Sequence, residues 1–219
     1  MEADAAGLGR RMPATPERQA HFLLGRVSGL RYVRQLPMSE PLHYRRVVVV
    51  THLELTDPGE LVPAREPRTP YSVMRAEFPS PEFGRFLYTA VGGDWFWLQR
   101  RDWSYERWLA WLDRPQLELW VAYVAGTPAG YFELEAQLGG DVEIVYFGLL
   151  RAHIGRGLGG ALLSDAVRRA WAMGARRIWL HTCDLDHPQA LVHYQARGFR
   201  IFKVEDTEEV VPEKPPGPW

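Results

Sequence analysis

The stretch Ile154-Gly-Arg-Gly-Leu-Gly-Gly160 decides the fold class, because it is rich in glycine and joins a predicted strand to a predicted helix. Glycines let a backbone approach a ligand without a Cβ in the way. The first N–H groups of a helix have no partner within it, and the helix dipole adds partial positive charge there. Arg151 and Arg156 add formal charge. The stretch predicts a loop that binds phosphate or pyrophosphate; tight strand–helix packing is the alternative explanation of its glycines.

The segments on both sides of this loop alternate strands and helices in a mixed order. Before the loop, strands are predicted over 47–56, 118–124, 129–136 and 142–150, and helices over 81–91 and 103–113. After it, the expected elements are a helix over 157–173, a strand over 177–183, a helix over 188–196 and a strand over 199–204. Short turns at 126–128 and 139–140 make the three middle strands an antiparallel meander. The order predicts an α/β fold with a mixed, mostly antiparallel central sheet flanked by helices.

Both ends of the chain differ in composition from this middle part. Residues 1–46 carry eight Arg against four acids and are expected to be poorly ordered or peripheral. Residues 205–219 carry five acids and then Pro-Pro-Gly-Pro-Trp, which predicts a solvated acidic, Pro-rich tail and no regular element. The folded domain is therefore expected over 47–204.

Composition excludes several classes of protein. A net charge of −1 argues against a nucleic-acid binder, and no apolar stretch reaches the ~20 residues of a membrane-spanning helix. One cysteine excludes an intramolecular disulfide framework, and the seven histidines lack metal-ligand spacing, so no metal is expected. No apolar segment of a signal peptide follows the N-terminal charges. A cytoplasmic location is expected.

The loop also fits the dinucleotide-binding pattern G-x-G-x-x-G, with Asp184 lying 24 residues beyond Gly160. In a dinucleotide fold the first glycine follows its strand almost directly, whereas residues 149–154 intervene here. Strands joined by short turns cannot be parallel, and only 59 residues remain for further strand–helix units. A Walker A loop is excluded because Gly-Lys-Ser/Thr is absent. The dinucleotide interpretation is rejected on these grounds.

Three segments in this order carry a family resemblance. They are Glu143-Ile-Val-Tyr-Phe-Gly-Leu-Leu150, the glycine-rich loop, and Ala190-Leu-Val-His-Tyr-Gln-Ala-Arg-Gly-Phe199. Together they resemble the GNAT superfamily of N-acetyltransferases, whose acetyl-CoA motif is Q/R-x-x-G-x-G/A and whose later segment is A-x-x-x-Y-x-x-x-G-F. The resemblance covers about residues 47–204. It implies a GNAT-like acyltransferase fold and direct transfer of an acetyl group from acetyl-CoA to the primary amine of a small molecule or peptide.

The resemblance also implies which residues bind the cofactor. The set is Phe147, Leu149, Ile154, Gly155, Arg156, Gly157, Leu158, Gly159, Gly160 and His187. The N–H groups of Phe147 and Leu149 match positions that polarise the thioester carbonyl, as an oxyanion hole does. Two positions depart from the family pattern. Ile154 occupies the Q/R position, for which Arg156 or Arg151 could compensate, and His187 stands where Asn is frequent, although His can also donate a hydrogen bond.

Two catalytic roles follow from the same resemblance. Glu143 lies 14 residues ahead of Gly157, the spacing of the base glutamate in the histone-acetyltransferase-like branch. A general base helps because a lysine-type amine has a pKa near about 10.4. Tyr194 matches the tyrosine that protonates the leaving thiolate. The alternatives are a solvent-facing glutamate at the sheet edge and an aromatic residue at the edge of the core.

Other polar groups are not assigned to the site. His181 and Cys183 lie two apart on one strand and lack a third partner, so Cys183 is interpreted as a core cysteine. A two-residue Gly139-Gly140 turn would pair Ala136 with Glu143. That register places the Glu133–Glu135 pair on the opposite face of the sheet, although a different turn length would reverse this.

The acceptor side is expected in the aromatic segment 83–111, which contains five of the nine Trp (95, 97, 103, 108 and 111). These aromatics favour an apolar or aromatic acceptor or a peptide end, unless they only pack the core or form a homodimer interface. Two other functions stay open: a non-catalytic CoA-binding or interaction module, and an acyltransferase that uses a longer acyl-CoA.

Overall fold

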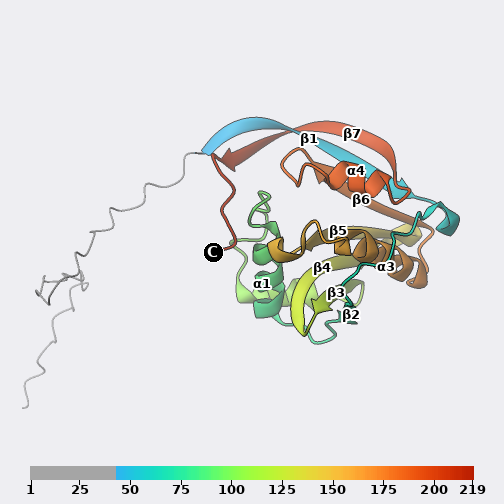
Figure 1. Ribbon diagram of the computed structural model, residues 1–219. Coiled ribbons are helices and arrows are strands. Elements are labelled where there is room, and N and C mark those ends of the chain that lie inside the picture. Colours follow the sequence, from blue (N-terminus) through green and yellow to red (C-terminus); the bar gives the residue numbers. More distant parts are fainter. Residues whose placement is uncertain (1–42) are drawn as a thin grey trace, which may run out of the picture. The chain divides into compact units, whose positions relative to one another are not determined.

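The computed structural model describes residues 43–219, so the predicted extension before His43 lies outside the described residues. Seven strands and four α-helices follow one another along this part of the chain (Figure 1). The strands are β1 (His43–Leu55), β2 (Ser72–Arg75), β3 (Leu117–Val124), β4 (Thr127–Ala136), β5 (Asp141–Leu149), β6 (Arg177–Cys183) and β7 (Arg200–Pro212). The helices are α1 (Pro81–Gly92), α2 (Tyr105–Leu112), α3 (Leu158–Ala172) and α4 (Ala190–Gln195). The short strand β2 was not predicted.

One sheet contains all seven strands, in the order β2-β3-β4-β5-β6-β1-β7. Every neighbouring pair is antiparallel except β5 and β6, which are parallel. The predicted meander is the β3-β4-β5 part of this sheet. The mixed, mostly antiparallel α/β fold expected from the sequence is confirmed.

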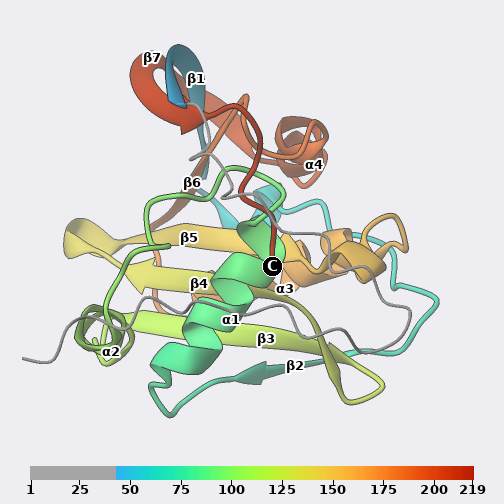
Figure 2. The same ribbon diagram turned by 90° about the vertical axis from the view of Figure 1, so that its left-hand side faces the viewer.

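Helices cover both faces of the meander, as Figure 2 shows for α1 in front of β3, β4 and β5 with α3 behind them. Side chains alternate between the two faces along each strand. In β4, Tyr131 packs with Leu87 and Val91 of α1, whereas the next residue, Phe132, packs in the core that contains Leu162 of α3. These two layers of apolar side chains fix the positions of the meander strands.

The connection between β4 and β5 is longer than predicted. Ala136 pairs with Val142, and the four residues 137–140 connect the two strands, with φ of 88° and 91° at Gly139 and Gly140. Glu135 therefore lies directly opposite Glu143, and Glu133, two residues away on β4, shares its face. The expectation that Glu133 and Glu135 face away from Glu143 was wrong, because the turn length sets the register.

Strands β5 and β6 separate soon after they meet. Their parallel pairing is confined to Asp141–Glu143 of β5 and Arg177–Trp179 of β6. Beyond Glu143, β5 continues beside β4 while β6 runs away from it (Figure 2). The second half of β5 thus has one free backbone edge.

The first strand lies between the last two. β1 pairs with β6 from Val50 to Leu55 and with β7 over nearly its whole length, so that β1 and β7 continue past β6 as a two-stranded arm. Its residues 43–46 belong to β1, not to a peripheral extension, and 205–212 belong to β7, not to a solvated tail. The backbone pairing of β1 with β7 carries both corrections, because it extends to His43 on β1 and to Pro212 on β7. It also places Arg45 and Arg46 beside the acidic run, where Arg45 approaches Glu208 at 3.7 Å.

The chain end after β7 also makes specific contacts. The Gly217 N–H donates to the Gly93 carbonyl at 2.8 Å, and Arg101 donates to the Gly217 carbonyl at 3.1 Å. A Cβ at Gly93 would lie 2.5 Å from the Gly217 carbonyl, so the close approach requires glycine there. The final residues are therefore held against the end of α1.

Candidate active site

The gap between β5 and β6 opens into a cleft of about 970 Å³. Its walls come from residues 95–100, 144–149 of β5, the glycine-rich loop, 179–183 of β6, the segment 185–194 that includes α4, and the β1–β7 arm. Strand separation is thus the physical origin of the cleft. Tyr194, His187 and the predicted cofactor loop apart from Arg156 and Leu158 line it.

The glycine-rich loop has the backbone geometry of an anion site. Gly155 and Gly157 have φ of 77° and 83°, a left-handed conformation that favours glycine. Gly157 precedes α3 and provides no side-chain cap. Within residues 43–219, the N–H groups of 157–160 donate no hydrogen bond to another backbone group, so they are available to a ligand. These features fit a pyrophosphate group.

The other loop side chains have distinct surroundings. Ile154 is partly exposed on the cleft, whereas Leu158 is buried in the core and offers only its backbone N–H. Arg151 Nε donates to Asp94 at 3.0 Å, so its charge is already paired. Arg156 is exposed and has no ion-pair partner among the described residues. Of the two arginines expected to compensate for Ile154, Arg156 is the one left available.

The free edge of β5 directs two N–H groups toward the gap. The Leu150 N–H donates to the Ala129 carbonyl on the β4 side at 2.9 Å. Backbone N–H groups alternate between the two edges of a strand, so those of Leu149 and Phe147 point to the edge that β6 has left. The two donors are two residues apart, about 7 Å along the strand, so each can donate to a different oxygen of a ligand, and either can polarise a carbonyl.

Glu143 lies at the position where β5 and β6 part. One carboxylate oxygen accepts from Gln137 Nε2 at 2.8 Å, and the other lies 3.5 Å from His181 Nδ1. Gln137 is fixed in turn by Trp179, whose Nε1 donates to its carbonyl oxygen at 3.0 Å. Glu143 is buried and is not part of the cleft lining, whereas His181 lines the cleft. The sequence-based assignment missed His181 because its partner lies on a different strand.

Tyr194 lies on the cleft among aromatic rings. Its ring contacts Phe147, His193 and Phe199 with centroid distances of 6.0–6.2 Å. Burial, followed by the charge of Asp186, raises the pKa of the Tyr194 phenol well above its usual value. The hydroxyl therefore stays protonated at neutral pH.

His187 has a defined tautomer. Its Nδ1 accepts a hydrogen bond from the Gln189 N–H at 3.0 Å, so in the neutral ring the proton is on Nε2. The ring packs edge-on against Trp95 at 4.7 Å. His187 can thus present a donor at the cleft, as expected for a residue in the place of Asn.

The tryptophan-rich segment divides between the cleft and the core. Trp95 and Trp97 line the cleft. Three others surround the guanidinium of Arg100, with ring centroids 4.1–5.7 Å from its Cζ: Trp103, Trp108 and Trp111.

Arg100 makes a buried ion pair that sequence reasoning missed. Its Nη1 donates to both Glu133 oxygens at 2.8 and 3.0 Å, and Trp111 Nε1 adds a third hydrogen bond at 3.1 Å. The two charged side chains are 3% and 0% exposed. Three of the five clustered tryptophans therefore pack around a charge in the interior.

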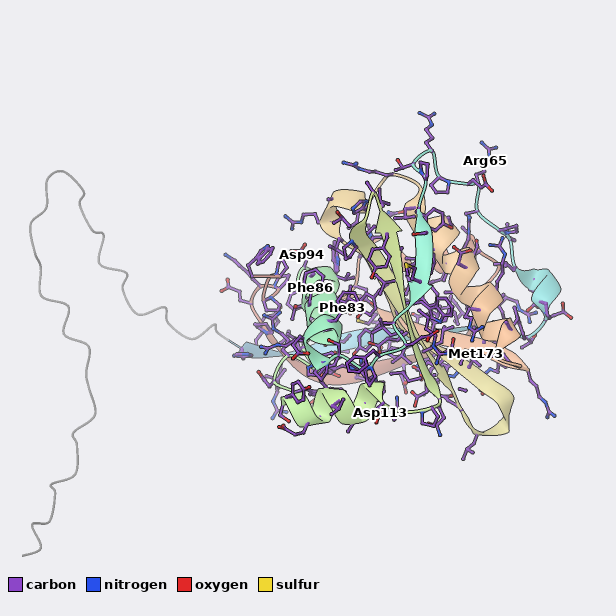
Figure 3. All side chains as sticks on the ribbon, turned by 90° about the horizontal axis from the view of Figure 1, so that it is seen from below. Arg65, Phe83, Phe86, Asp94, Asp113 and Met173 are labelled. Carbon is purple, nitrogen blue, oxygen red and sulfur yellow. The ribbon has the colours of Figure 1, made fainter. Side chains whose placement is uncertain are left out.

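Further aromatics expected at the acceptor side lie elsewhere. Phe83 and Phe86 stack on α1 with a centroid distance of 6.4 Å, and Figure 3 shows them together on that helix with Asp94 beyond its end. Neither ring is part of the cleft lining. Among residues 43–219, no three His, Cys, Asp or Glu side chains are grouped to hold a metal ion, and no helix is long and apolar enough to cross a membrane.

Comparison with known proteins gives a family match and a fold match. Residues 82–199, just over half of the chain, match the model of the acetyltransferase (GNAT) family. A GCN5-related N-acetyltransferase from Sphaerobacter thermophilus superposes with a TM-score of 0.54 at 19% identity, covering 78% of this chain and 54% of that one. One from Kribbella flavida gives 0.54 at 18% identity, covering 77% and 60%.

At 18–19% sequence identity, the structural similarity to these two proteins shows a shared fold and nothing more specific. The chain spans between 54% and 60% of the length of these two relatives. No curated protein sequence gives a match.

Proposed function

Since the chain belongs to the acetyltransferase (GNAT) family, we propose that it is an N-acetyltransferase that moves an acetyl group from acetyl-CoA to the primary amine of a small molecule or peptide. The observation that carries this proposal is the meeting of two donor sets on one cleft. The glycine-rich loop offers N–H groups for a pyrophosphate, and the free edge of β5 offers the N–H groups of Phe147 and Leu149, either of which can donate to a thioester carbonyl.

The chain's own groups account for each requirement of direct transfer. When bound, acetyl-CoA supplies the activated acetyl group. A base at the Glu143 end of the cleft removes a proton from the ammonium form of the acceptor. The nitrogen then bonds to the acetyl carbon as the carbon–sulfur bond breaks. The Tyr194 hydroxyl donates its proton to the departing sulfur and recovers one from the nitrogen through solvent, so the products are an acetamide and a thiol.

The test is turnover with a panel of primary amines. The purified full chain is incubated with acetyl-CoA and arylalkylamines, polyamines and peptides with free N-termini. Thiol release is followed with a chromogenic reagent, and the product is identified by mass spectrometry. A product heavier than its amine by one acetyl group supports the proposal. Tight binding of acetyl-CoA by calorimetry without turnover of any amine would instead favour a non-catalytic CoA-binding module.

The apolar lining of the cleft favours testing a second donor class. Trp95, Trp97 and Leu149 border the cleft and offer apolar surface to a longer acyl chain. Mass spectrometry of the ligand retained through purification distinguishes acetyl-CoA from a longer acyl-CoA. Parallel turnover with acetyl-CoA and octanoyl-CoA then ranks the two donors by kcat/KM.

A further inference from the structure

We propose that the group in this protein that takes the proton from the acceptor amine is the imidazole of His181, and that Glu143 is its positioning residue. The inference rests on the proposed acetyl transfer and names the base for that reaction. It differs from the expectation that the Glu143 carboxylate meets the amine itself.

Access separates the two side chains. The side chain of His181 is 47% exposed and lines the cleft, whereas that of Glu143 is 11% exposed and is absent from the lining. His181 stands on β6 two residues beyond Trp179, the last residue paired with β5, so it is the first side chain on that face after the strands separate. An amine in the cleft reaches the imidazole before it reaches the carboxylate.

Hydrogen-bonding capacity sets the tautomer of His181. A carboxylate only accepts hydrogen bonds, so the 3.5 Å contact of Glu143 with His181 Nδ1 favours the tautomer that carries its proton on Nδ1. Nε2 then keeps its lone pair and has no hydrogen-bond partner among residues 43–219. Gln137 holds the other Glu143 oxygen at 2.8 Å and thereby fixes the carboxylate. The arrangement of carboxylate, Nδ1–H and free Nε2 is that of a general base and its orienting partner.

The other charged neighbours stabilise the imidazolium that forms when His181 takes a proton. His52 on β1 lies with its ring centroid 5.8 Å from that of His181, and its own Nε2 contacts Glu205 on β7 at 2.8 Å. Asp186, in the loop after β6, is engaged by Thr182 and by the Cys183 N–H. Three carboxylates therefore surround the position at which the imidazolium forms, against one histidine whose partner is Glu205.

The proton balance is complete within the cleft. His181 Nε2 takes one proton from the ammonium of the acceptor, which frees the nitrogen lone pair to bond to the acetyl carbon. Glu143 stabilises the imidazolium that results. The imidazolium returns its proton to solvent once the products leave, so no oxidant, reductant or metal is required.

A pH profile distinguishes His181 from Glu143 as the base. Contact with the Glu143 carboxylate raises the pKa of His181 above its ordinary value of about 6.5, although burial opposes this effect. The base must be neutral to work, so kcat/KM rises with pH through that raised pKa. Glu143→Gln removes the charge, which lowers the pKa of His181 and moves the acidic limb to lower pH. His181→Asn removes the limb and lowers kcat/KM by roughly 10²-fold, the usual contribution of a general base.

The experiment has an activity arm and a spectroscopic arm. The activity arm measures kcat/KM against pH for the wild type, Glu143→Gln, His181→Asn and the control His43→Asn, using the amine with the highest turnover in the panel. Added imidazole is expected to restore part of the activity of His181→Ala. The spectroscopic arm titrates histidine-¹⁵N-labelled protein by NMR, with the His181 signal identified by its loss in His181→Asn.

Each arm can overturn the inference separately from the proposed function. If His181→Asn keeps the acidic limb and the rate, or if Glu143→Gln abolishes the limb outright, the base is Glu143. If NMR gives His181 the same pKa in the wild type and in Glu143→Gln, the coupling is absent. Failure of every amine in the panel counts against acetyl transfer alone, because the NMR titration and the tautomer of His181 are read without turnover.

Discussion

At the scale of single residues, the Tyr194 phenol lies on the cleft wall among aromatic rings. Burial raises the pKa of its hydroxyl, so the group carries its proton at neutral pH. A thiolate that leaves from a carbonyl at the free edge of β5 would need such a donor nearby. Phe147 connects the two features because it lies on β5 and contacts the Tyr194 ring.

Tyr194→Phe tests the acid role without changing the packing of the ring. We expect kcat to fall by roughly 10²-fold while the Kd of acetyl-CoA, measured by calorimetry, stays the same, since only a transition-state proton donor is removed. Phe199→Leu is the matched control, because it alters the packing next to Tyr194 and keeps the hydroxyl. An unchanged kcat for Tyr194→Phe would remove Tyr194 from the mechanism.

The buried Arg100–Glu133 pair makes a residue-scale prediction about stability. Glu133→Ala leaves the Arg100 charge buried without a counter-ion, and breaking such a pair costs about 3–5 kcal/mol. Glu135 is the matched control, because it is on the same strand face and pairs with Arg114 at a more exposed position. Glu135→Ala is expected to cost about 1 kcal/mol or less. Urea unfolding measures both free energies, and equal losses would contradict the importance of burial.

At the scale of the elements, the free N-terminus of α3 and the left-handed glycine before it act as one unit. Gly157 has φ of 83° and no side-chain cap, so the helix begins without using its own N–H groups. A polar cap would consume one of the donors that a phosphate needs. The loop thus leaves its N–H donors unpaired, as the proposed binding of a pyrophosphate requires.

Gly157→Ala separates strain from ligand binding. Alanine in a left-handed conformation costs about 1–2 kcal/mol, and relief of that strain would reorient the loop N–H groups. We expect a weaker Kd for acetyl-CoA by calorimetry. Gly126→Ala in the β3–β4 turn is the control, because Gly126 also has a positive φ of 79° and open space at Cβ. It should lose similar stability and keep the Kd; a matching loss of affinity in both variants would contradict the role of the loop.

At the scale of the whole described unit, the first and last strands of the chain, β1 and β7, complete the sheet. β1 lies between β6 and β7. The two-stranded arm of β1 and β7 contributes Val48, Val50, Thr207 and Glu209 to the cleft wall. The first and last strands therefore help to define the site, although neither carries a family motif. The docked end at Gly217 extends this closure to the end of α1.

Truncation tests whether 205–212 is a strand or a tail. Removing residues 205–219 takes away the partner of β1 from His43 to Val50, so we expect a large loss of thermal stability and of acetyl-CoA binding. Removing only 213–219 keeps β7 and should cost far less. Calorimetric unfolding of both variants measures the difference. Equal stability of the two would show that the strand pairing contributes little.

The sequence predicted the features that depend on neighbouring residues, but not those that depend on residues far apart in the chain. The meander, α1, α2 and the cofactor loop could be predicted because their causes are local: short turns, Ser80 and Ser104 as helix caps, and glycines where φ is positive. The face of Glu133 relative to Glu143 could not, since it depends on a connection of four residues where the sequence suggested two. The acidic run at 205–209 looked solvated because its basic partner lies at the other end of the domain.

The sequence alone determined the family, the order of the middle elements and the position of the cofactor loop, because backbone preferences and glycine conformations act over a few residues. Only the tertiary structure decided which charges meet. It brought Arg100 to Glu133, His181 to Glu143 and the basic start of β1 to the acidic end of β7. Those contacts depend on strand register and on where β5 and β6 separate. Both are outcomes of packing the whole sheet, and neither can be read from spacing along the chain.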